Sequence, residues 1–301
     1  MDFAYASGSL SVKIAELKRL ENQLTNLGNK TNEEIVEFLN HLQIAGNAEL
    51  KSFGEIIIAS EQSLFKELKS LLNEDYYYLL DLVYADEVLT FLNLTLNKVK
   101  YEDKFKAFDY IHISLASLLL GEMVGMQEHY GKIITQVTKQ VSEKGRKQEA
   151  LLTKLFYEHL ATNLENHPFL LAKQTMINLR SLYRSKKLEL SAEDYKIELL
   201  GDDTNREKFL NLYRLEDKQI VSALKDKFDV KASSTYEHII NNERSIDKYL
   251  DKYLADKVAN LMFSTDFIDL FIFYSYQYRR IIKELKKIYY RVEKYEANRN
   301  N

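Results

Sequence analysis

Apolar residues recur along most of the chain at intervals of three, four and seven, which places them on one face of a helix. The first such set is Leu10, Ile14, Leu17, Leu24 and Leu27. This spacing predicts an amphipathic helix from Leu10 to Leu27. The same pattern predicts helices over residues 53–96, 105–142 and 147–164, and two helices within 246–295 that meet near Ser264–Asp266.

Several short motifs predict where helices begin. Thr31 and Glu34 form a capping box, in which each side chain satisfies the other's exposed backbone amide. Pro168 is the only proline and is expected to open a helix over 169–187, since a first-turn proline loses no needed amide bond. Weaker start signals are Ser191 with Asp194, Thr204 with Glu207 and Ser234 with Glu237. Residues 201–205 and 229–234 are the expected late loops.

The amino-acid composition also favours a fold made entirely of helices. Glycine and proline together make up 10 of 301 residues, about 3%, against roughly 12% in an average chain. Folds that turn every few residues are therefore excluded. The 46% of apolar and 29% of charged residues suffice for a core and a polar surface. The expected fold class is all-α.

Charge and cysteine content narrow the class of protein. The chain has no cysteine, which excludes disulfides and thiolate chemistry, and its net charge of −3 gives no basic footprint for nucleic acid. Its longest stretch without charged residues, Tyr110–Gly121, is shorter than the roughly 20 residues of a membrane-spanning helix. The first ten residues lack the features of a secretory signal. We expect a cytoplasmic protein without a direct membrane span.

No catalytic, cofactor-binding or metal-binding motif is visible. The six histidines form no pair at the spacing that turns two ligands onto one helical face, although ligands from distant segments remain open. His112 lies in the most apolar stretch and is interpreted as a hydrogen-bonded core or interface residue. The nine glycines form no phosphate-binding loop. The expectation is a protein that is not an enzyme and carries no cofactor.

Two segments of opposite charge stand out. Residues 71–97 contain five acids and no base, whereas residues 278–295 contain seven bases against two acids. These segments either complement each other, contact separate partners, or are solvated faces. The partner-contact candidates are Arg279, Arg280, Lys283, Lys286 and Lys287 on the basic side and Glu74, Asp75, Asp81, Asp86 and Glu87 on the acidic side.

A faint internal repeat links two charged segments. Asn93-Leu94 is followed by Lys98 and Lys100, and Asn178-Leu179-Arg180 is followed by Arg184, Lys186 and Lys187. The two Asn-Leu pairs are 85 residues apart. Coincidence explains the similarity equally well, because cations favour helix C-termini in general.

The chain resembles a known family at several of these points. The opening Asp2-Phe3-Ala4-Tyr5-Ala6-Ser7, the helix with Glu16 and Leu17, and the sequence Thr31-x-x-Glu34-x-x-x-Phe38-Leu39 look like the start of a rotary-motor protein. Asn178-Leu179-Arg180 with Lys186-Lys187 matches the helix endings of the same family. That family is the C subunit of the prokaryotic V-type (A-type) rotary ATPases, the counterpart of the eukaryotic d subunit.

The resemblance implies three similar helical modules, at residues 1–104, 105–199 and 200–301, arranged as a pseudo-threefold funnel. It implies a central-stalk subunit that transmits torque between the rotor shaft and the membrane rotor ring, peripheral at the inner face of the membrane. The N-terminal helix is expected to pack against C-terminal helices. Two alternatives remain open: a freestanding helical scaffold that binds proteins, and a helical enzyme whose residues converge only in three dimensions.

Overall fold

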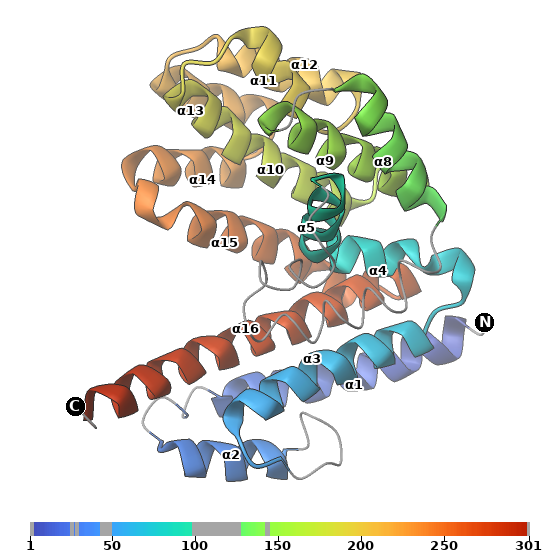
Figure 1. Cartoon of the computed structure of the whole chain (residues 1–301), viewed down its shortest axis with the longest axis vertical. Coiled ribbons are helices and arrows are strands. Elements are labelled where there is room, and N and C mark those ends of the chain that lie inside the picture. The colour runs from blue at the N-terminus through green and yellow to red at the C-terminus, as the bar shows by residue number, and fades with distance from the viewer. Residues whose placement is uncertain are drawn as a thin grey trace. The chain divides into compact units, whose positions relative to one another are not determined.

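The protein is all-helical wherever its structure is described. The computed structural model describes residues 3–24, 27, 30–42, 50–97, 128–141 and 145–299, which hold fourteen α-helices and no strand (Figure 1). The all-α prediction is therefore confirmed. The first part of the helix expected at 105–142, with His112, lies outside the described residues.

Contacts along the chain group it into two compact units. Unit 1 takes residues 1–88, 99–127 and 261–301, and unit 2 takes residues 89–98 and 128–260. One boundary falls inside α5 (Ala85–Leu96), between Val88 and Leu89. The three modules expected from the resemblance, divided at 104 and 199, differ from these units and stay a prediction.

Unit 1 is built around the two ends of the chain. Its described helices are α1 (Phe3–Leu24), α2 (Asn32–His41), α3 (Phe53–Ser70), α4 (Tyr78–Val83) and α16 (Phe267–Arg299), with the short 3₁₀ helix η2 (Glu74–Tyr76). Both α1 and α3 pack along α16 (Figure 1). The apolar stripe of α1 is buried there, with Leu10, Ile14 and Leu17 at most 7% exposed. The predicted packing of the N-terminal helix on a C-terminal helix is confirmed.

Unit 2 is a succession of helices packed on their neighbours. They are α8 (Glu128–Gln140), α9 (Arg146–Ala161), α10 (Pro168–Lys187), α11 (Ala192–Glu198), α12 (Asp203–Tyr213), α13 (Asp217–Lys227), α14 (Val230–Asn241), η4 (Glu243–Ser245) and α15 (Ile246–Val258), followed by η5 (Ala259–Phe263) at the boundary with unit 1. Helix α10 contacts α11, α12, α14 and α15 and forms the centre of the unit.

Most predicted helix starts are confirmed. Thr31 and Glu34 form the capping box of α2, with Thr31 N donating to Glu34 Oε2 at 2.8 Å. Pro168 is the first residue of α10, and the Ser191 hydroxyl accepts the Asp194 amide at the start of α11. The junction near 264–266 separates η5 from α16, as expected.

Two predicted starts are wrong, and the reason is the same in both. Helix α12 is capped by Asp202 rather than Thr204, and α14 by Asp229 rather than Ser234. Each aspartate accepts a backbone amide at 2.7 Å, from Asn205 and Ala232 respectively. Because aspartate caps a helix at least as well as serine or threonine, the earlier residue starts the helix. The expected loop at 229–234 is consequently helical from Val230 onward.

The asparagines of the faint repeat make different hydrogen bonds. Asn178, fully buried on α10, donates to Leu200 O at 3.0 Å and accepts from Leu200 N at 2.9 Å. Asn93 instead donates to the Glu149 carboxylate at 3.1 Å. The pair of hydrogen bonds seen at Asn178 recurs at Asn40, whose side-chain amide donates to the C=O of Leu50 and accepts from its N–H.

Candidate functional site

An ion pair between Arg279 and Glu87 joins the acidic and basic segments inside unit 1, and another pair ties the basic segment to α3. Helix α16 carries its bases at intervals that place them on different faces, and some of these faces turn toward α3, α4 and α5. One buried pair joins Lys286 Nζ to Glu61 Oε1 at 2.5 Å, with the two side chains 13% and 8% exposed. A charge this far from water must be paired to be tolerated. Lys286 is therefore part of the interior of unit 1.

Arg279 makes a second pairing, about two helical turns before Lys286. Its guanidinium donates to the Glu87 carboxylate and to the backbone oxygen of Val83. It also lies 4.6 Å from the centre of the Tyr84 ring, a cation–π distance. Burial lowers the pKa of Arg279, but Glu87 together with other nearby acidic groups outweighs burial, and the pKa is raised. The guanidinium stays charged and holds the α4–α5 junction against α16.

A third cluster joins α1, α3 and α16. The Tyr274 hydroxyl donates to Glu67 Oε1 at 3.0 Å, and Lys13 Nζ lies 2.6 Å from the same oxygen. Burial, and then the charge of Glu67, raise the pKa of Tyr274 above its ordinary value. The neutral hydroxyl and the ammonium thus share one carboxylate, which ties the two ends of the chain to α3.

The predicted partner-contact residues divide into two groups. Asp81, Glu87, Arg279 and Lys286 are buried or bonded within unit 1. The Arg279–Glu87 pair joins the two charged segments, whereas Lys286 pairs with Glu61, outside the acidic segment. The exposed candidates are Arg280, Lys283 and Lys287 on α16, Glu74 and Asp75 in η2, and Asp86 on α5.

The exposed bases of α16 lie on one side of that helix. Arg280, Lys283, Lys287 and Arg291 are spaced by three, four and four residues, which aligns them on a helix surface. We call these four residues the basic stripe. Arg280 lies 3.5 Å from Glu21 of α1 and Lys287 lies 2.5 Å from Glu284, but all four of these side chains are 43–56% exposed. Ion pairs this open to water are weak, so the stripe is available to an acidic partner.

Sequence analysis missed Glu61 and Glu67 as the partners of the bases. Glu61 lies four residues after Ile57 and three before Leu64, on the buried stripe of α3. An acid at such a position is a usable signal, because it requires a cation from another element. Spacing alone does not say that this cation is 225 residues away.

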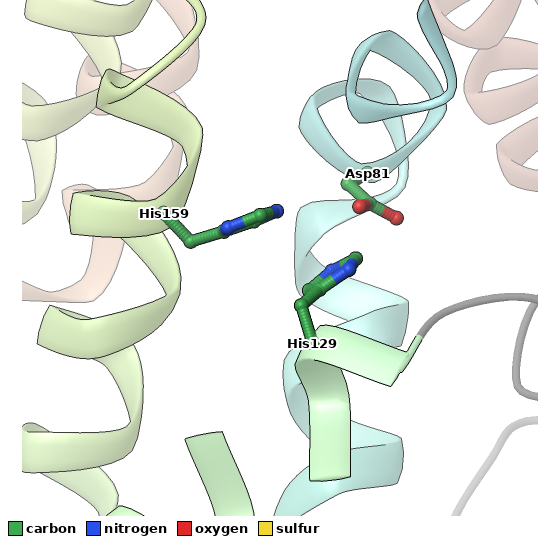
Figure 2. Close-up of side chains that lie close together, drawn as sticks. All are labelled: Asp81, His129 and His159. Atoms are coloured by element: carbon green, nitrogen blue, oxygen red, sulfur yellow. The ribbon is translucent and has the colours of Figure 1, made fainter. Parts of the chain in front are cut away.

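Two histidines meet in unit 2. His129 of α8 and His159 of α9 stack with ring centres 3.9 Å apart and planes 19° from parallel (Figure 2). They are 30 residues apart in a chain with no histidine pair at helical spacing. No sequence pattern predicted this pair; the packing of α8 on α9 creates it.

The candidate functional site is therefore the basic stripe, on a helix that buried ion pairs hold in place. None of the described helices is both long enough and apolar enough to span a bilayer. Comparison of the chain with protein-family models, with curated proteins and with solved structures gave no match.

Proposed function

We propose that this chain is a non-catalytic central-stalk subunit of a V/A-type rotary ATPase. In this role it couples the rotor shaft of the soluble head to the membrane rotor ring and transmits torque for ion transport or ATP synthesis. It works at the inner face of the membrane, held there by the complex. The resemblance of residues 2–7, 31–39 and 178–187 to the C subunit of these motors supports the proposal.

The observation that carries the proposal is the junction of the two chain ends on α3. Torque transmission requires a body that resists sliding of one helix along another. The pairs Lys286–Glu61, Arg279–Glu87 and Tyr274–Glu67 fix α16 at three levels along its length. The two ion pairs are specific in register, because a shift of one turn would leave a buried charge without its partner. Unit 1 is thus suited to carry load.

Short connections support the same role in unit 2. Helix α12 ends at Tyr213 and α13 begins at Asp217; α13 ends at Lys227 and α14 begins at Val230. Connections of this length leave little freedom between packed helices. In the finer form of the proposal, the chain forms three modules around a pseudo-threefold funnel.

The proposed contact with the rest of the motor is the basic stripe of α16. Its four cations lie on a firmly held helix and remain open to water. A partner surface of acidic side chains would bind them with an affinity that falls as salt rises. The exposed acids Glu74, Asp75 and Asp86 are the proposed contacts to a second, basic partner surface.

The test is recovery of the chain's partners from detergent-solubilised membranes of the source cell. A tagged chain is expected to retain the rotor ring and the central-stalk subunits, identified by mass spectrometry. The triple variant Arg280→Glu, Lys283→Glu, Lys287→Glu is expected to lose one of these partners. Its matched control, Lys218→Glu, Lys225→Glu, Lys227→Glu, reverses three exposed bases of α13 and should retain both.

Two outcomes would contradict the proposal. If cells that contain an intact rotary ATPase yield the chain alone or with unrelated proteins, the freestanding protein-binding scaffold becomes the better assignment. If both partners remain bound to the stripe variant at every salt concentration, the stripe is a solvated face and not the contact.

A further inference from the structure

The histidine pair of unit 2 has a geometry that ordinary packing does not require. His129 and His159 come from two helices that pack on each other, and Figure 2 shows their rings facing one another. Their centres are 3.9 Å apart, and at least one nitrogen of each ring lies within 4.8 Å of one on the other. The lone pair of each imidazole nitrogen lies in the plane of its ring, so a shared cation would bind at the edge of this stack and not between its faces.

We propose that His129 and His159 together bind a divalent transition-metal ion of the Zn²⁺ class. Imidazole nitrogen is a preferred ligand of such ions. A shared Zn²⁺ with bonds of about 2.1 Å allows its two nitrogens to lie at most about 4.2 Å apart. One nitrogen of each ring already lies within 4.8 Å of the other, so at most a small adjustment of the side chains is needed. Water completes the coordination, so the ion is exchangeable.

The surroundings of the pair suit a metal ion. Both imidazoles are partly exposed, which gives the ion and its water access. The ring of His129 also lies edge-on to Tyr130, with centres 4.3 Å apart, and Tyr130 is only 4% exposed. This contact limits the movement of His129 and so prepares it to bind. The bound ion would join α8 to α9.

His238 provides a matched comparison within the same unit. Its ring also stacks nearly parallel to a neighbour, with centres 4.8 Å apart, but that neighbour is Tyr249. Stacking at His238 is therefore the same packing interaction without a second imidazole. A binding signal that depends on His129 and His159 but not on His238 separates a metal site from an aromatic contact.

The experiment is calorimetric titration of the full chain, freed of any histidine tag, with Zn²⁺ alone. We expect about one ion per chain, and binding weakened at least tenfold by either His129→Gln or His159→Gln, since even loss of an outer-shell partner costs 10–100-fold. His238→Gln should bind like the wild type. Thermal melts should show a metal-dependent rise in Tm for the wild type and His238→Gln only.

Loss of folding in a variant does not leave the proposal undecided. Imidazole NMR signals of the wild type, labelled at its six histidines, should show two resonances that shift together on addition of Zn²⁺. Equal affinity of all four proteins for Zn²⁺, absence of binding by the wild type, or shifts spread over all histidines would each overturn the proposal. None of these readouts depends on the ATPase assignment.

Discussion

Lys286 places an ammonium where little water reaches it, 2.5 Å from the Glu61 carboxylate. Four of its neighbours on α16 carry the same kind of charge into solvent. The difference is one of helical face: Lys286 falls next to the buried Leu285 and Ile282, whereas the adjacent Lys287 is half exposed. Two lysines of the same helix thus differ in their contribution to stability: Lys286 needs its buried partner, whereas Lys287 is mainly solvated.

Replacement of Lys286 by methionine should lower the free energy of unfolding by about 3–5 kcal/mol, because Glu61 is left buried without its cation. Lys287→Met, which breaks the exposed pair with Glu284, should change it by less than about 1 kcal/mol. Urea unfolding followed by circular dichroism measures both. Equal effects of the two variants would mean that water reaches Glu61.

Stability should also fall at high pH. Burial raises the pKa of Tyr274, Tyr253 and Tyr236 in the folded protein. Their neutral form is therefore favoured on folding, so the stabilisation is complete below the unfolded pKa of about 10 and is lost as the pH rises above it. The urea midpoint is expected to decrease steadily between about pH 9 and about pH 11.5.

The variant Tyr274→Phe isolates one of these tyrosines. It removes the ionisable hydroxyl together with its bond to Glu67. The variant should be less stable at about pH 8 but lose less stability than the wild type on going to about pH 11.5. An unchanged slope against pH would mean that other groups, such as Tyr253 and Tyr236, cause the alkaline loss of stability.

Among the elements, α10 is held by an interaction that pattern reading could not anticipate. The Asn178 side chain bonds both backbone groups of Leu200, 22 residues later, and both residues are buried. In α2 the Asn40 side chain does the same for Leu50, but there the site is only partly buried. The two asparagines therefore make the same pair of hydrogen bonds, one at a buried site and one at a partly buried site.

Asn178→Ala should therefore destabilise the protein by about 2–4 kcal/mol, because the N–H and C=O of Leu200 lose their partners out of reach of water. Asn40→Ala should cost about 1 kcal/mol, since water can replace the amide at Leu50. Thermal or urea unfolding of the two variants under identical conditions gives the ratio. A smaller effect at Asn178 than at Asn40 would contradict the dependence on burial.

The positions of the helices were predictable from local chemistry. The first residue of a helix was predictable only where the sequence offered a single capping residue. The apolar stripe of α1 and the Thr31–Glu34 box are local signals and proved correct. At α12 and α14 an aspartate a few residues before the predicted cap is the residue that caps the helix. Pairings such as Glu61 with Lys286 join residues 225 apart, and nothing in local spacing encodes them.

At the scale of the whole molecule, unit 1 depends on both ends of the chain. The five apolar residues of its first segment, Leu10, Ile14, Leu17, Leu24 and Leu27, are at most 7% exposed. At about 1.5–3 kcal/mol each, their burial contributes roughly 7–15 kcal/mol. This equals the total stability of a typical domain, so the remainder of unit 1 has no margin without them.

Deletion of residues 1–27 should consequently abolish cooperative unfolding of unit 1. Calorimetry is expected to show one transition fewer, or a broad one, relative to the full chain. Leu10→Ala, at a fully buried site, should give a partial effect of about 2–5 kcal/mol. Val12→Ala, at a site 61% exposed, should give almost none. A deletion product that melts cooperatively like the full chain would refute this dependence.

The return of the chain to unit 1 after unit 2 also orders events during synthesis. Helices α1 and α3 leave the ribosome early, but α16 begins only at Phe267, whereas α3 ends at Ser70. At about 5–20 residues per second, the roughly 200 residues between them take on the order of 10–40 s to make. Throughout that interval the faces that α16 will cover remain accessible to chaperones, proteases and other nascent chains. A premature stop near the end of the gene would make that exposure permanent.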